Sequence, residues 1–184
     1  MVVGIDRRVG TDSDAAADVA SSARVLIVAD FSASKVGNAS VADQLAVRLA
    51  SAGDHVITTS DQSNRWFRAS DMVLTSLRNR RAVDAAVVDV YSGAAFRWAE
   101  WTTAILRSAG TPVIHVLRGG NLPSFAAKNP GRVARLLDSG TAVVALSGYL
   151  YDEMSRYGHV TDLIPNPLEV SAYPFRVREN AQPR

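Results

Sequence analysis

The sequence predicts an α/β protein with one Rossmann-like, doubly wound parallel sheet and helices on both faces of that sheet. Its apolar runs are nearly continuous instead of alternating, which is typical of parallel strands covered on both faces. These runs occupy residues 24–30, 55–60, 84–91, 112–117 and 141–147. Helical patterns separate the runs, so strand and helix alternate along the chain, as they do in a doubly wound fold.

A glycine stands before three of the predicted strands. The stretches "SAGDHV", "SAGTPV" and "DSGTAV" place Gly53, Gly110 and Gly140 three residues before a valine that opens an apolar run. Glycine commonly closes a helix in the left-handed conformation, which other residues avoid. We therefore expect each of these glycines to end a helix with a positive φ angle.

Apolar residues recur at helical spacing between the runs. They are Val41, Leu45 and Leu49 in the first predicted helix and Trp98, Trp101 and Ile105 in the third. Asn129 followed by Pro130 predicts the start of a later helix, with the asparagine as its cap and the proline in its first turn.

Length and composition indicate one soluble globular domain. The chain has 184 residues, which suits one domain. It has no cysteine, which excludes a disulfide framework, and its three histidines are too scattered to have metal-ligand spacing. Residues 1–23 read as a disordered tail without a secretory signal, residues 24–168 as the domain, and residues 169–184 as a linker. We expect a cytoplasmic protein.

Charge narrows the class of partner. The formal net charge is +2, and the first 23 residues hold two arginines against four aspartates, so the rest of the chain carries +4. A mildly basic body suits an anionic ligand or membrane surface. The charge is too small to predict nucleic-acid binding.

Ligands of doubly wound sheets bind beyond the carboxyl ends of the strands, which ranks the motifs by position. Gly37 and Asn38 follow the first strand, at the expected start of a helix, where backbone N–H groups suit an anionic group. The alternative is that Asn38 caps the helix and Gly37 permits the turn. The spacing matches neither the dinucleotide fingerprint nor the nucleotide-triphosphate loop.

The stretch "HVLRGGN" ends the fourth predicted strand at the same edge. We expect Arg118 to project there, Gly119 and Gly120 to permit close backbone approach, and Asn121 to offer a donor and an acceptor. A structural loop is the alternative. His115 lies inside the apolar run and is interpreted as a hydrogen-bonded core residue.

Two further strand ends carry polar residues. Asp89, Tyr91 and Ser92 lie at the end of the third strand, with site and structural readings equally open. Ser147 ends the fifth strand, and its hydroxyl most economically caps the following helix. A phosphorylation-receiver domain has the same alternation of strands and helices. It needs an acidic pair after the first strand, however, and here Asp30 stands alone.

The predicted second helix, residues 65–81, combines an apolar stripe with basic ends. The stripe is Trp66, Val73, Leu74 and Leu77, and the arginines are Arg65, Arg68, Arg78, Arg80 and Arg81. One interpretation is a helix that packs its stripe on the core and keeps a solvated basic rim. The other is peripheral contact with anionic lipid.

Residues 143–180 resemble the end of the N-terminal domain in family 4 glycosyltransferases, which have the GT-B fold of two Rossmann-like domains facing across a cleft. The features that carry the resemblance are the strand end at Ser147, Tyr149, Gly158, "IPNP" at 164–167 and Y-x-F-R-x-R at 173–178. H-x-x-R-G-G-N-L-P at 115–123 adds to the likeness, which spans residues 24–184.

The resemblance implies a retaining sugar transfer from a nucleotide sugar to a glycan or lipid-linked acceptor, with no cofactor or metal and with this domain on the acceptor side. It places the donor diphosphate near Gly37 and Asn38, although many relatives have two glycines there. Arg118 stands where a histidine often faces the sugar, which suggests charge stabilisation or acceptor binding. The expected substrate-binding residues are Tyr91, Ser92, Arg118, Gly119, Gly120, Asn121, Ser147 and Asn166, and no catalytic residue is assigned.

The resemblance also implies a donor domain after the "IPNP" segment, with two glutamates separated by seven residues. Glu100, Glu153, Glu169 and Glu179 do not have that spacing. We therefore expect this chain to be an acceptor half that is poorly active or inactive alone. A non-catalytic module that binds a glycan, a nucleotide or a partner domain is the alternative, and half of a nucleotide-sugar epimerase is a third reading.

Overall fold

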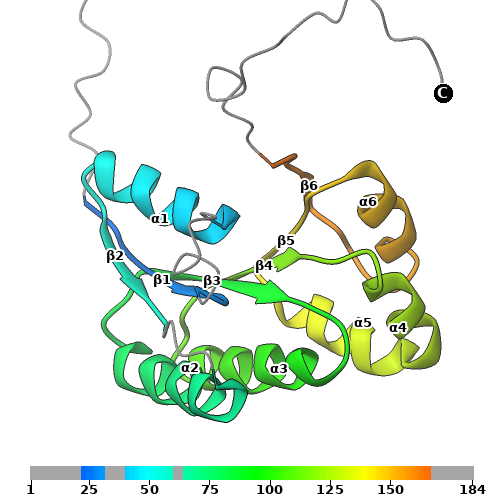
Figure 1. Cartoon of the computed structure of the whole chain (residues 1–184), viewed down its shortest axis with the longest axis horizontal. Coiled ribbons are helices and arrows are strands. Elements are labelled where there is room, and N and C mark those ends of the chain that lie inside the picture. Colours follow the sequence, from blue (N-terminus) through cyan, green and yellow to red (C-terminus); the bar gives the residue numbers. More distant parts are fainter. Residues whose placement is uncertain (1–21, 32–39, 60–63, 167–184) are drawn as a thin grey trace, which may run out of the picture.

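The computed structural model describes residues 22–31, 40–59 and 64–166, and it confirms the predicted fold class. Within these residues the chain forms a six-stranded, entirely parallel sheet in the order β2-β1-β3-β4-β5-β6 (Figure 1). The strands are β1 (Arg24–Val28), β2 (His55–Thr58), β3 (Ala85–Val90), β4 (Val113–Leu117), β5 (Ala142–Ala145) and β6 (Asp162–Leu163). The helices are α1 (Val41–Ser51), α2 (Arg65–Asn79), α3 (Ala94–Arg107), α4 (Leu122–Lys128), α5 (Pro130–Ser139) and α6 (Gly148–Met154).

The strand order reverses beside β1. The chain passes from β1 to β2 on one side and then returns to place β3 on the other side, after which the strands follow in sequence. In open α/β sheets this switch point leaves a crevice at the carboxyl ends of the strands, where ligands bind. The topology therefore points to the ends of β1 and β3.

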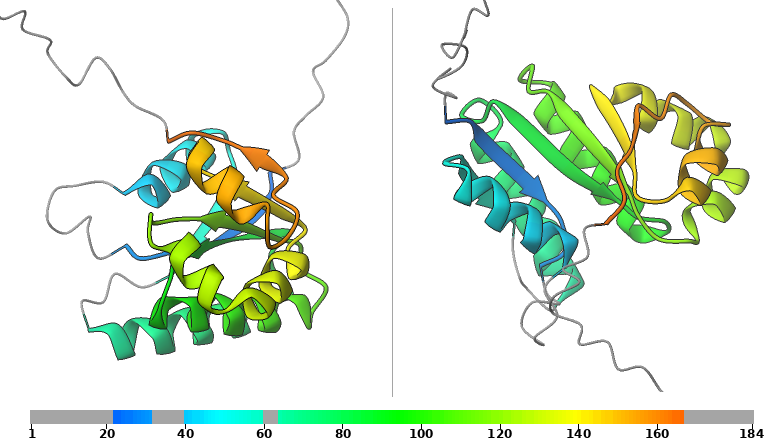
Figure 2. Two further views of the ribbon diagram at one scale, coloured as in Figure 1. Left: turned by 90° about the vertical axis from the view of Figure 1, so that its right-hand side faces the viewer. Right: turned by 90° about the horizontal axis from the view of Figure 1, so that it is seen from above.

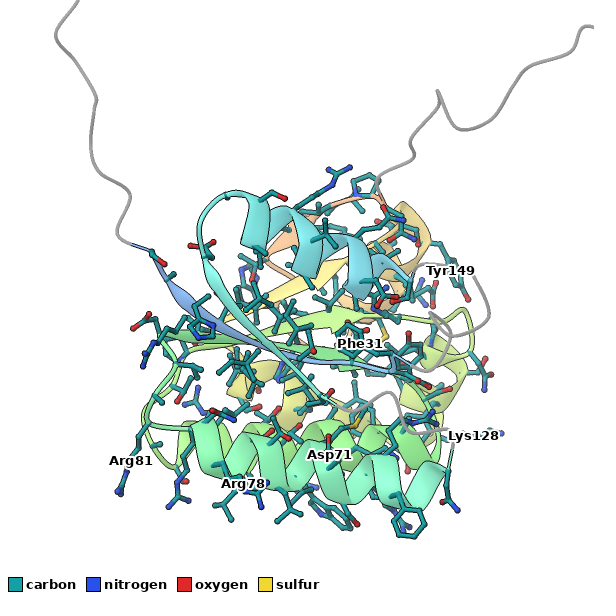
Figure 3. The ribbon with its side chains drawn as sticks, turned by 60° about the vertical axis from the view of Figure 1, so that its left-hand side comes forward. Phe31, Asp71, Arg78, Arg81, Lys128 and Tyr149 are labelled. Carbon is teal, nitrogen blue, oxygen red and sulfur yellow. The ribbon has the colours of Figure 1, made fainter. Side chains whose placement is uncertain are left out.

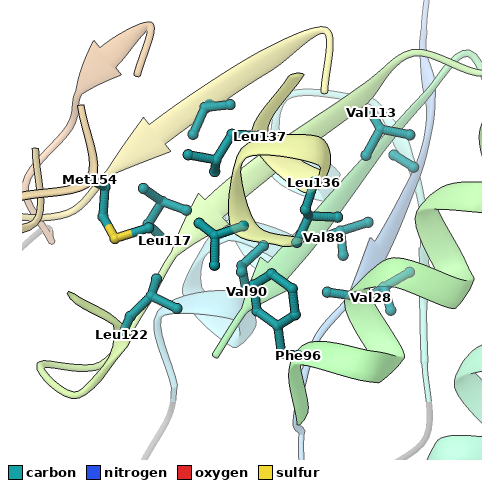
Figure 4. Packing of buried hydrophobic residues seen from close by; sticks show 14 of the residues in the cluster. Val28, Val88, Val90, Phe96, Val113, Leu117, Leu122, Leu136, Leu137 and Met154 are labelled. Atoms are coloured by element: carbon teal, nitrogen blue, oxygen red, sulfur yellow. The ribbon is translucent and has the colours of Figure 1, made fainter. Parts of the chain in front are cut away.

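Successive residues of each strand serve opposite faces of the sheet. On β3, Val88 packs into the larger core with α3 and α5, whereas Val87 packs toward α1. In Figure 4, Leu136 of α5 lies beside Val88, and Phe96 of α3 lies beside Val90, all within the larger core. Truncating a fully buried phenylalanine such as Phe96 to alanine costs about 3–5 kcal/mol, and this side of the sheet holds the larger of the two buried clusters.

The prediction for the closing glycines is correct at two positions and wrong at the third. Gly53 and Gly110 have φ angles of 98° and 81°. Gly140 instead has a φ of −75°, in extended backbone. A Cβ at Gly140 would lie 2.7 Å from Nδ1 of His115, so this position is glycine because the backbone passes close to the buried imidazole.

Helix starts differ from the sequence prediction in their caps. α1 begins at Val41, and Ser40 and Asp43 form a reciprocal capping box, so the cap is Ser40 and not Asn38. Pro130 opens α5 as predicted. Asn129 precedes it, but its side-chain amide donates to the carbonyl of Phe125 instead of capping the helix.

The apolar stripe predicted to pack α2 on the core is wrong in part. Ala69, Met72 and Ser76 form the buried face of this helix, while Leu74 and Leu77 are 45% and 44% exposed. The core-facing side of α2 thus carries two small residues and a methionine, and the two leucines lie on its outer side. The tryptophans of α3 divide in the same way: Trp98 packs on the core and Trp101 is half exposed.

Candidate functional site

A pocket of about 330 Å³ lies at the carboxyl ends of β1 and β3, between α2 and α3. We call it the switch-point pocket. Its floor is apolar, and its polar and aromatic lining consists of Asp30, Arg68, Asp89, Tyr91 and Trp98. Polar groups that converge on an apolar floor at a topological switch point are the usual form of a small-molecule site.

Asp30 follows β1 and is held by α2. Its Oδ1 accepts a hydrogen bond of 3.0 Å from Nη1 of Arg68. The two side chains are 39% and 21% exposed, so they remain within reach of a ligand. Arg68 therefore lines the pocket.

Asp89 is the most buried charged group of the pocket. Oδ2 of Asp89 lies 2.6 Å from Nε of Arg118, and the side chains are only 4% and 11% exposed. The contact is a close ion pair, and Nε of Arg118 and the other carboxylate oxygen, Oδ1 of Asp89, have no geometrically aligned hydrogen-bond partner among the described residues. Breaking such a pair on one side only leaves a buried uncompensated charge.

Burial raises the pKa of Asp89 from 3.8 to about 6, although the charge of Arg118 opposes this shift. The negative charge of Asp30 adds a smaller increase to the same pKa, so the two carboxylates interact. The sequence shows no second acidic residue next to Asp30 after the first strand. In the structure, Asp89 of β3 lines the same pocket as Asp30 and interacts with its charge. Burial, and then the charge of Asp89, also raise the pKa of Tyr91.

The loop after β4 lies beside Tyr91, as the shared carboxyl edge predicted. Gly119 has a φ of 82°, and a Cβ there would be 3.7 Å from the Tyr91 ring. The residues that follow at the carboxyl edge of the sheet are exposed: Gly119, Gly120 and Asn121. Asn121 precedes α4 but makes no side-chain cap, so its amide is available to a ligand.

Other predicted site residues lie apart from this pocket. The Ser147 hydroxyl accepts a 3.3 Å hydrogen bond from the Leu150 amide and caps α6, as the sequence indicated. Asn166 lines a groove on the α1 face of the sheet. Ser92 is half-buried just after β3, whereas Gly37 and Asn38 fall outside the described residues.

His115 is a core residue, as predicted. It is fully buried, and its Nε2 lies 3.0 Å from the hydroxyl of Thr103 on α3. Burial lowers the pKa of His115 to about 4, with a smaller contribution from the charge of Arg107. The imidazole is therefore neutral near pH 7 and has a structural role.

Sequence reasoning missed Asp30, Arg68 and Trp98 as pocket residues. Asp30 follows the apolar run of β1, and Asp89 lies one residue before the end of β3. Each is therefore an acidic residue at the end of a predicted strand, which the sequence shows. What brings them together is the pairing of β1 with β3, which is a property of strand order.

No family model and no curated protein matches the chain.

Two classes of feature are absent from the described part of the chain. It contains no group of three or more histidine, aspartate or glutamate side chains that could hold a metal ion. None of its helices is both long and apolar enough to cross a membrane.

Proposed function

We propose that this chain is the acceptor-binding domain of a retaining glycosyltransferase, with the sugar acceptor held in the switch-point pocket. The observation that carries the proposal is the joint presence of carboxylate, guanidinium and aromatic groups at the switch point of the sheet. The volume of the switch-point pocket, about 330 Å³, falls in the range of small-molecule sites.

The chemistry of a sugar ring matches these groups. A sugar presents hydroxyls at its edge, which donate to carboxylates and accept from guanidinium groups, and C–H bonds on its faces, which pack on aromatic rings. Asp30, Arg68 and Tyr91 are partly exposed and supply such contacts. Asp89 lines the pocket but is only 4% exposed, and its ion pair fixes Arg118 beside the site.

The donor side of the proposal rests on the resemblance. Breaking a sugar–phosphate bond requires groups that stabilise the charge developing on the leaving diphosphate. The resemblance assigns one such contact to Gly37 and Asn38 and the others to a second Rossmann-like domain. In this proposal the acceptor half alone transfers sugar slowly or not at all, and a donor domain completes the site.

A peripheral membrane contact is the second part of the proposal, with the protein on the cytoplasmic side. Arg78 lies on the side of α2 away from the sheet, and Arg81 follows the end of the helix (Figure 3). Phe67 and Trp101 are 67% and 52% exposed on α2 and α3. Exposed arginines and exposed aromatic rings on two neighbouring helices suit an anionic lipid surface. The Arg65 side chain lies outside the described part of the chain, and the Arg80 side chain is half-buried.

The amide NMR spectrum of the 184-residue chain tests the proposal. We expect at least one member of a panel of mono- and disaccharides to shift the amides of Asp30, Tyr91 and Gly119 together. A saccharide panel that leaves these amides unmoved, while a free nucleotide shifts them, would favour a nucleotide-binding module. Nucleotide-sugar turnover is measured in parallel, and rapid transfer by this chain alone contradicts the acceptor-half assignment.

A further inference from the structure

The two faces of the sheet are covered unequally. α2, α3 and α5 lie across one face, whereas α1 is the only described helix on the other face (Figure 1). Seen from above, β3, β4 and β5 are open between α1 and the segment around β6 (Figure 2, right). Parallel sheets normally have both faces buried, so this open area needs an explanation.

A groove of about 600 Å³ occupies this open area. Its floor consists of Val87, Ile114, Val116 and Val144, and its α1 wall consists of Leu45 and Leu49. The opposite wall continues from β6 into Ile164, which is 55% exposed. We call this the sheet-face groove.

We propose that the sheet-face groove binds one amphipathic α-helix of a partner polypeptide. The floor spans β3, β4 and β5, which are two strand spacings of about 4.8 Å each, or roughly 10 Å. An α-helix with its side chains is about 10–12 Å in diameter, so a single helix fills the gap. Helices cover the other face of the sheet in the same way, because an apolar sheet face must be buried against another layer.

Charge at the groove specifies the partner helix further. Arg48 on the α1 wall and Asp162 of β6 both line the groove, and neither has an ion-pair partner among the described residues. Arg118 also lines the groove, but its charge is already paired with Asp89. The complementary helix therefore has an apolar stripe, a carboxylate on the flank toward α1 and a basic residue on the flank toward β6. An acyl chain offers neither charge.

The probe is a fluorescein-labelled designed helix with leucines at i, i+3, i+4 and i+7 spacing, glutamates on one flank and lysines on the other. Its binding to the full chain is measured by fluorescence anisotropy. We expect a dissociation constant below about 1 mM, the boundary of weak association. Ile164→Lys, at an exposed wall position, should weaken binding at least about tenfold, because it places a charge against the apolar stripe and a cation beside the lysine flank.

Charge reversal distinguishes specific binding of the helix from nonspecific hydrophobic association. Arg48→Glu should weaken binding of the first helix about threefold or more and strengthen binding of a helix with its flanking charges exchanged. Arg97→Glu is the matched control, because this exposed arginine lies on α3 across the sheet and should leave both affinities unchanged.

Three results overturn the proposal. One is the absence of helix binding to the full chain. Another is equal binding by wild type, Ile164→Lys and Arg48→Glu. The third is self-association of the chain, seen by analytical ultracentrifugation and abolished by Ile164→Lys, which identifies a second copy as the occupant.

Discussion

Arg118 and Asp89 form a nearly buried ion pair, 2.6 Å between Nε and Oδ2, that joins the carboxyl ends of β4 and β3. The register of the two strands sets this contact, because Asp89 pairs with Val116 and the amide of Arg118 donates to the carbonyl of Val90. Both side chains thus emerge on the α1 face, beside the switch-point pocket on one side and the sheet-face groove on the other.

The ion pair predicts strongly unequal effects of single and double substitution. Arg118→Met leaves the Asp89 carboxylate buried without its counter-charge and should lower the free energy of unfolding by about 3–5 kcal/mol. Arg118→Met combined with Asp89→Leu should be close to neutral, because both charges are removed. Urea unfolding of the three proteins at pH 7.5 measures the difference. A single variant that loses less than the double variant contradicts this account.

Asp89 also predicts a pH dependence of stability. Its folded-state pKa is raised from 3.8 to about 6, so the folded state favours the protonated carboxyl. The resulting stability is fully present below pH 3.8 and is lost as pH rises to about 6, by about 3 kcal/mol. Asp89→Asn cannot ionise, so the difference in unfolding free energy between Asp89→Asn and wild type should change by this amount across that window. A constant difference would show that burial does not control this pKa.

His115 predicts the opposite slope over nearly the same range. Its folded-state pKa is lowered from 6.5 to about 4, so the neutral imidazole stabilises the fold. This stability is present above pH 6.5 and is lost as pH falls toward 4, again by about 3 kcal/mol. In wild type the two slopes partly cancel. His115→Gln removes one slope and should leave a protein whose stability falls with rising pH between 4 and 6; stability that rises there instead would be inconsistent with these assignments.

Gly140 predicts a packing defect that Gly120 does not share. Gly140→Ala places a Cβ 2.7 Å from His115 Nδ1 and 3.0 Å from the carbonyl oxygen of Ala142, and it should destabilise the fold by about 1–3 kcal/mol. Gly120→Ala meets nothing within 4 Å and should change stability by less than about 0.5 kcal/mol. Thermal unfolding compares the two, and equal midpoints would rule out the close approach as the reason for glycine at position 140.

The membrane contact predicts a loss of vesicle binding on charge reversal. Arg78→Glu combined with Arg81→Glu should reduce sedimentation with vesicles of anionic phospholipid and leave the weak binding to zwitterionic vesicles unchanged. Arg135→Glu combined with Arg156→Glu is the charge-matched control on α5 and beyond α6. Equal losses in both double variants would attribute binding to net charge alone.

The sequence predicted the sheet well because each buried parallel strand is a local apolar run. It also placed Tyr91 and the loop at Gly119 at one edge, since the carboxyl ends of parallel strands must meet there. The contact between Asp30 and Arg68 could not be predicted, because it depends on α2 returning over β1 in three dimensions. The helix stripe failed for a related reason: periodicity identifies an apolar face of α2 but not which face meets the sheet, and the small residues Ala69 and Ser76 made that contact.

Isothermal titration of a saccharide that shifts the Tyr91 and Gly119 amides tests the central claim most directly. Asp30→Asn removes a partly exposed carboxylate from the switch-point pocket and should weaken binding about tenfold or more, as expected for hydrogen bonds to a charged group. Asp152→Asn, an exposed position on α6, should bind as wild type does. Equal affinity of Asp30→Asn and wild type would contradict the assignment of the acceptor to this pocket.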